Sequence, residues 1–145
     1  GYTEKINEAS PSASYSLVVP LDEPYLHGRN LTYEEALIYA IKKRDIRYII
    51  ASLILFRKIS DWDLLYSLAK KENLVREVAV LYDVARKVVR KIKRMPKRFL
   101  NLAKKDFSEF RYIISPISSD DFKDIEKKWN MGVPLNRSDL EEYSR

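Results

Sequence analysis

Five lysines and arginines bracket one apolar segment of the chain, residues 46–57, and form the first candidate site. They are Lys43, Arg44, Arg47, Arg57 and Lys58. Guanidinium and ammonium groups bind phosphate oxygens through charge-assisted hydrogen bonds, so this set predicts a nucleotide-binding cluster. Lys43 and Arg47 are four residues apart and share a face if one helix or a tight corner joins them. Helix-end electrostatics and ion pairs with nearby aspartates explain the same residues equally well.

A second candidate site is the basic block, residues 86–111, with 11 Lys/Arg against 2 Asp/Glu and a net charge of +9. The rest of the chain is slightly acidic, so the whole excess of the +6 chain lies in this block. A local positive field of this size attracts phosphates. The predicted nucleic-acid contacts are Arg86, Lys87, Arg90, Lys91, Lys93, Arg94, Lys97 and Arg98, with Tyr82 and Tyr112 as rings for base stacking. The alternative is a solvated helix face.

The chain offers little to the common kinds of enzyme chemistry. It has no cysteine, one histidine and three glycines in 145 residues, and none of the glycines lies in a phosphate-cradling motif. That excludes disulfides, iron–sulfur clusters and thiol catalysis, and it argues against a metal site. Paired carboxylates at 34–35, 61–63 and 120–121 open expected helices, where capping accounts for them. We therefore predict no catalytic residue, no metal ligand and no cofactor of the chain's own.

The apolar pattern predicts an all-α protein, an irregular bundle of six or seven helices with at most a short extended segment near residues 17–21 or 112–114. The polar stretch 1–16 predicts a flexible N-terminal tail, and 17–145 a single helical domain. The expected helices span 33–44, 46–57, 61–71, 73–95, 97–105, 120–130 and 139–144. Their expected caps are Thr32 with Glu35, Asp45, Ser60 with Asp63, and Ser119, and their expected stop is Gly132.

Hydropathy gives an expectation about location. No apolar run approaches the 18 residues of a membrane-spanning helix, and no signal-peptide pattern is present. We expect a cytoplasmic protein with no membrane partner. The basic block would associate it with the nucleoid.

Residues 47–68 (RYIIASLILFRKISDWDLLYSL) resemble, without a gap, the C-terminal domain of the large subunit of archaeal and eukaryotic primases. In that family an arginine opens a buried helix, an aliphatic run follows, and an aliphatic–Ser/Thr pair precedes a second amphipathic helix. Arg47 and the pair Ile59–Ser60 occupy those positions here. The family's four iron–sulfur cysteines are missing. In this the chain looks like the third, non-catalytic subunit of some archaeal primases, which is a cluster-free relative.

The resemblance implies an accessory, non-catalytic subunit of a DNA primase. Such a subunit would bind the initiating NTP and the single-stranded DNA template, while catalytic and large primase subunits act as its partners. The triphosphate would lie at Arg47, with Lys43 and Arg44 in the preceding turn. A lysine that the family places late in the aliphatic run matches Leu55 here, and Arg57 or Lys58 would substitute for it. No iron–sulfur cluster is implied, and Mg²⁺ would arrive only with a bound nucleotide.

Two other functions fit the same residues. The chain could be a docking protein or adaptor, whose charges only keep it soluble and which binds no nucleic acid at physiological salt. It could also be an antitoxin- or regulator-like helical binder that prefers duplex to single strands. Neither alternative has a nucleotide-specific site, so the preference for a triphosphate separates both from the primase interpretation.

Overall fold

The protein is an irregular bundle of helices, as the computed structural model describes it over residues 31–105 and 109–143. The α-helices are α3 (Tyr33–Lys42), α4 (Ile46–Leu55), α5 (Trp62–Lys71), α6 (Val75–Val88), α7 (Lys97–Lys105) and α8 (Lys123–Trp129). Three 3₁₀ helices accompany them: η2 (Phe56–Lys58) follows α4, η3 (Asp120–Phe122) precedes α8, and η4 (Arg137–Tyr143) is the last element described. The all-α prediction is confirmed. The expected tail at 1–16 and extended segment at 17–21 lie outside the described residues.

Local capping chemistry starts three of these helices. Thr32 and Glu35 form the expected capping box at α3, because the Thr32 side chain accepts from the Glu35 amide and the Glu35 carboxylate accepts from the Thr32 amide. Asp45 caps α4 by accepting from the Arg47 amide. At α5 the expected cap, Ser60, is wrong by one residue. Asp61 accepts from the Leu64 amide instead, while the Ser60 amide donates to the buried carboxylate of Glu34.

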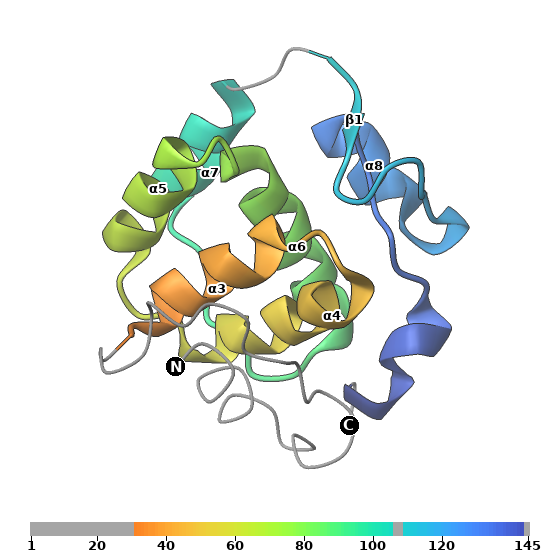
Figure 1. Ribbon diagram of the computed structural model, residues 1–145, viewed down its shortest axis with the longest axis horizontal. Coiled ribbons are helices and arrows are strands. Elements are labelled where there is room, and N and C mark those ends of the chain that lie inside the picture. Colours follow the sequence, from red (N-terminus) through yellow and green to blue (C-terminus); the bar gives the residue numbers. More distant parts are fainter. Residues whose placement is uncertain (1–30, 106–108, 144–145) are drawn as a thin grey trace.

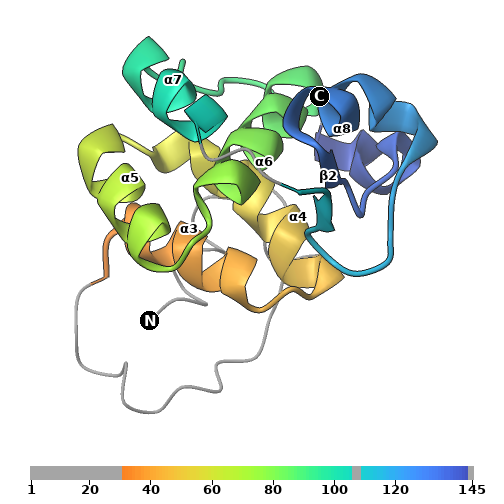
Figure 2. The ribbon, with the colours of Figure 1, turned by 90° about the horizontal axis from the view of Figure 1, so that it is seen from above.

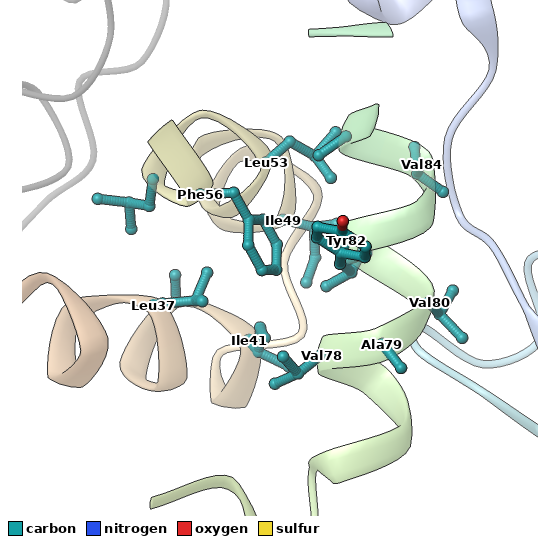
Figure 3. Packing of buried hydrophobic residues seen from close by; sticks show 14 of the residues in the cluster. Leu37, Ile41, Ile49, Leu53, Phe56, Val78, Ala79, Val80, Tyr82 and Val84 are labelled. Atoms are coloured by element: carbon teal, nitrogen blue, oxygen red, sulfur yellow. The ribbon is translucent and has the colours of Figure 1, made fainter. Parts of the chain in front are cut away.

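The core is built around α4, whose apolar residues are buried on nearly every side. Helices α3 and α6 pack against it, and α5 packs against α3 and α6. Figure 3 shows Leu37 and Ile41 of α3 and Ile49 and Leu53 of α4 converging on α6. Figures 1 and 2 place α5 and α7 on one side of α6 and α8 on the other. Helix α6 is therefore the element that both halves of the structure share.

The long helix predicted for residues 73–95 is wrong at its C-terminal end. Helix α6 stops at Val88, and Val89 already has extended backbone angles, φ −112° and ψ 138°. No proline or glycine marks this end. The chain then runs without helix until α7 begins at Lys97. The basic block is thus divided among the end of α6, an irregular connection, the short helix α7 and the start of β1.

A two-stranded parallel ladder closes the C-terminal part. β1 (Arg111–Tyr112) pairs with β2 (Met131–Gly132), with Tyr112 opposite Gly132. Gly132 was expected to stop the preceding helix, but Asn130 does so by adopting a left-handed conformation with φ 53°. Gly132 is needed for another reason. A Cβ atom at this position would lie 2.5 Å from Cδ1 of Tyr112 and 2.8 Å from the Ile117 carbonyl oxygen.

Among the described residues, no helix combines the length and the apolar character needed to cross a membrane.

Candidate nucleic-acid interface

The connection between α6 and α7, residues 89–96, is here called the basic strap. Val89, Ile92 and Met95, every third residue, are 6%, 8% and 1% exposed. The intervening positions are exposed and carry cations in pairs, Arg90–Lys91 and Lys93–Arg94. The strap therefore anchors itself with regularly spaced apolar side chains and presents two pairs of positive charges to solvent.

Three hydrogen bonds hold the strap backbone in place. Arg57 Nε donates to the Arg90 carbonyl at 2.8 Å, and Arg86 Nη1 donates to the Ile92 carbonyl at 3.2 Å. The Met95 amide donates to the hydroxyl of the buried Tyr82 at 2.9 Å. Because the anchoring groups come from α6 and η2, the strap is fixed to the core rather than hanging from it. Its cations are consequently presented at defined positions, which lowers the entropy cost of binding.

Apart from Arg90, which is exposed and has an interaction of its own within the chain, the predicted nucleic-acid contacts of Lys and Arg separate into two groups. One group makes no hydrogen bond or ion pair with any other residue in the described parts of the chain, and consists of Lys91, Lys93, Arg94 and Lys97. In the other group, Arg86 holds the strap, Lys87 pairs with Asp124, and Arg98 pairs with Asp63. Tyr82 is only 5% exposed and its hydroxyl is occupied by Met95, so its ring offers no face to a base. Tyr112 is half-buried, with its ring 5.0 Å from that of Phe110.

The predicted nucleotide cluster is divided between the two ends of α4, about 15 Å apart for a ten-residue helix. At the first end, Arg47 is exposed and lies 3.7 Å from Asp45. The Lys43 ammonium lies 5.0 Å from the Tyr39 ring centroid and 6.0 Å from that of Tyr48. The structure brings Lys43, Arg44 and Arg47 to one corner and does not bring Arg57 or Lys58 there.

At the second end of α4, Arg57 belongs to the strap. Partial burial lowers the pKa of its guanidinium, because desolvation disfavours the charged form. The guanidinium donates to the Arg90 carbonyl of the strap. Lys58 is exposed, and its ammonium lies 6.0 Å from the Tyr33 ring centroid. Arg57 is therefore a neighbour of the nucleic-acid candidates, and Lys58 lies by the start of α3, away from Lys43 and Arg47.

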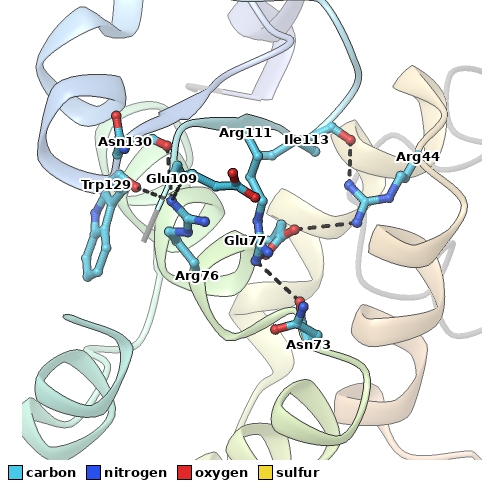
Figure 4. Close-up of polar contacts among 9 residues, drawn as sticks. All are labelled: Arg44, Asn73, Arg76, Glu77, Glu109, Arg111, Ile113, Trp129 and Asn130. Atoms are coloured by element: carbon cyan, nitrogen blue, oxygen red, sulfur yellow. Dashed lines mark hydrogen bonds and ion pairs between the residues drawn. The ribbon is translucent and has the colours of Figure 1, made fainter. Parts of the chain in front are cut away.

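Arg44 takes part in an ion-pair cluster around a buried carboxylate that the sequence did not reveal (Figure 4). The cluster is centred on Glu77, whose side chain is fully buried in α6. Arg44 lies 3.5 Å and Arg111 2.8 Å from its two carboxylate oxygens. Arg44 also donates to the Ile113 carbonyl at 2.9 Å. Its guanidinium thus links α3 to the β1 segment, which places a structural task on a residue expected to bind phosphate.

Arg76, the neighbour of Glu77, is 1% exposed. Its Nη1 atom donates to the carbonyls of Glu109, Trp129 and Asn130 at 2.8, 3.4 and 3.1 Å (Figure 4). Trp129 and Asn130 end α8, so a cation sits where that helix presents unsatisfied carbonyls and a partial negative charge. No sequence signal distinguishes Arg76 from an exposed arginine, because its partners lie 33 to 54 residues away.

The Lys87–Asp124 pair gives a pH-dependent prediction. The hydrogen bond from Lys87 is the largest cause that holds the pKa of the Asp124 carboxyl below its usual value, about 3.9. The pair therefore stabilises the folded protein at pH values above about 3.9, and this contribution is lost as the pH falls through the lower pKa of the folded state. We expect Lys87→Gln to raise the pKa of Asp124 toward 3.9 in a carboxyl-detected NMR titration. As a control, Lys127→Gln, which removes a lysine from the same helix as Asp124, should leave the pKa of Asp124 unchanged. An Asp124 pKa equal in both variants would contradict the assigned cause.

Within the described parts of the chain, no three His, Cys, Asp or Glu side chains lie close enough together to hold a metal ion. Comparison with protein-family models, with curated proteins and with solved structures finds no match to this chain. The case for a function therefore comes from the residues themselves, and the basic strap is the strongest feature among them.

Proposed function

We propose that the chain is an accessory, non-catalytic subunit of a DNA primase that binds single-stranded DNA through the basic strap and the start of α7. One observation carries the binding part of the proposal. Lys93 and Arg94, which have no partner among the described residues, are exposed on a backbone that three hydrogen bonds fix to the core, and Lys97 follows them at the start of α7. The primase context is supported by the resemblance of residues 47–68.

Phosphates, rather than base edges, are the groups that this surface suits. Lysine and arginine in an exposed row neutralise successive phosphates and release counterions, which gives sequence-independent and salt-dependent affinity. The initiating NTP would bind at the corner of Lys43 and Arg47, with Mg²⁺ arriving on its phosphates. Polymerase chemistry would belong to the catalytic subunit, and the large subunit would complete the assembly.

The proposal is tested by the fluorescence anisotropy of a labelled single strand at several salt concentrations. For single strands, each phosphate contact contributes about 0.7 to the slope of log K against log salt. Lys93→Gln with Arg94→Gln should therefore flatten that slope by about 1.4. A matched control, Lys123→Gln with Lys127→Gln, removes the same charge from α8 and should leave the slope almost unchanged. Equal slopes for the two double variants would overturn the role of the strap.

The same anisotropy assay with three DNA probes distinguishes the possible functions. The probes are the strand with a 5′-triphosphate, the strand without it, and a duplex. Tighter binding of the triphosphorylated strand supports the primase assignment, and indifference to the triphosphate leaves a general single-strand binder. Preference for the duplex would replace the proposal with a regulator-like function. Absence of binding to all three would favour a docking protein.

A further inference from the structure

A groove runs along the seam between α5 and α7, which lie side by side in Figures 1 and 2. At one end of the seam the hollow measures about 480 Å³, within the range of small-ligand sites. Its lining comes from α5, from the turn before α6 and from α7. These residues are Tyr66, Lys70, Asn73, Val75, Leu102 and Lys105. We call this hollow the Tyr66 groove.

Helical spacing explains why these side chains share the seam. On α5, Tyr66 and Lys70 are four residues apart, and on α7 the spacing from Leu102 to Lys105 is three. The Tyr66 ring is held edge-on by the buried Phe99 of α7, with the two centroids 5.5 Å apart. A half-buried aromatic ring that packing already holds is a suitable platform for a base, since little freedom remains to be lost.

Among the described residues, the charged side chains that line the Tyr66 groove are both lysines. The Lys70 ammonium lies 6.0 Å from the Tyr66 ring centroid, and Lys105 lines the groove from α7. No carboxylate of the described residues belongs to this lining. The acidic residues of the seam, Asp61 and Asp63, line its other end, where Asp63 pairs with Arg98. The occupant should therefore combine a flat aromatic part with negative charge.

We propose that the Tyr66 groove binds one nucleotide of a single strand, with the base against the Tyr66 ring and the flanking phosphates at Lys70 and Lys105. The apolar side chains of Val75 and Leu102 complete the contact with the base, and the Asn73 amide supplies a donor and an acceptor. The inference rests on the proposed function. A strand that follows the basic strap meets α7 at Lys97 and reaches Lys105 after nine residues of helix, about 12 Å.

The test compares a thymidine oligonucleotide with an abasic strand of the same length, using fluorescence anisotropy and the full chain. Both strands carry the same phosphates, so the strap binds both. A single stacked base should favour the oligonucleotide by about tenfold. Tyr66→Leu should abolish that preference and leave the abasic strand unaffected, while Tyr66→Phe keeps the ring and should retain it. Lys70→Gln should weaken the binding of both strands several-fold, because both carry the flanking phosphates, and the matched control Lys71→Gln should not.

Each outcome separates this inference from the proposed function. Equal binding of the two strands by the natural chain would overturn the base-binding role of the groove and would leave the DNA-binding role of the strap standing. A preference that survives Tyr66→Leu would likewise overturn it. Failure of both strands to bind would overturn the proposed function and the groove together. Because Lys70 is exposed, its variant should fold normally, and equal affinities for Lys70→Gln and Lys71→Gln would overturn the groove even if Tyr66→Leu weakens the packing with Phe99.

Discussion

Replacement of Arg76 by methionine should lower the free energy of unfolding by about 2 to 4 kcal/mol, because a buried carbonyl that loses its hydrogen-bond donor costs about 1 to 3 kcal/mol. Methionine fills much of the volume but donates no hydrogen bond. The carbonyls of Glu109, Trp129 and Asn130 would lose the donor that now joins them. The end of α8 would also lose the cation that offsets its partial negative charge.

Urea denaturation and amide hydrogen exchange together check this prediction. The urea concentration at the unfolding midpoint should fall. The ladder amides of Arg111 and Ile113, which donate to the carbonyls of Asn130 and Gly132, should be the first to lose protection from hydrogen exchange. Arg94→Met is the matched control, because Arg94 is exposed and should change stability by less than about 0.5 kcal/mol. A loss below about 1 kcal/mol for Arg76→Met would mean that the guanidinium does not hold the two halves together.

The central helix was predictable because its determinants are local. Asp45 caps α4 through an amide two residues away, and the apolar side chains that follow are buried at almost every position. Thr32 and Glu35 are equally local, three residues apart. Where the capping residue directly precedes the apolar pattern of a helix, the local sequence is enough to predict where that helix begins.

The strap was not predictable for the opposite reason. Val89, Ile92 and Met95 are spaced by three, a spacing that fits the stripe of a continuing helix as well as an extended anchor. What decides between them is a set of remote groups, the Arg57 guanidinium and the Tyr82 hydroxyl, which satisfy strap backbone atoms that a helix would have paired internally. Tertiary hydrogen bonds thus override a helical pattern here.

The roles of the candidate site residues also depend on contacts with residues that are distant in the sequence. The neighbouring cations predict that Arg44 binds phosphate, but its carboxylate partner, Glu77, is 33 residues away in the sequence. The Tyr66 groove escaped notice because it joins α5 to α7, and neither helix shows by itself that its aromatic residue borders a hollow. A cation count locates positive charge along the chain, yet only the fold shows which cations are already engaged.

Phe56→Ala should cost about 3 to 5 kcal/mol of unfolding free energy, as expected for removing a fully buried aromatic ring. The Phe56 ring packs between α4 and α6, as Figure 3 shows, with centroids 6.0 Å from Tyr82 and 6.5 Å from Trp62. The cavity would leave Tyr82 without one of its supporting rings. Since the Tyr82 hydroxyl accepts from the Met95 amide, we expect the damage to reach the strap.

Hydrogen exchange at Met95 distinguishes this coupling from a general loss of stability. In Phe56→Ala the Met95 amide should lose protection before the amides of α4, under conditions in which the protein remains folded. Phe56→Leu, which keeps most of the volume, should cost less than about 1.5 kcal/mol and preserve the protection of Met95. If the Met95 amide opens only with global unfolding in both variants, the strap is held by its own apolar anchors. The aromatic cluster would then have no part in presenting the cations.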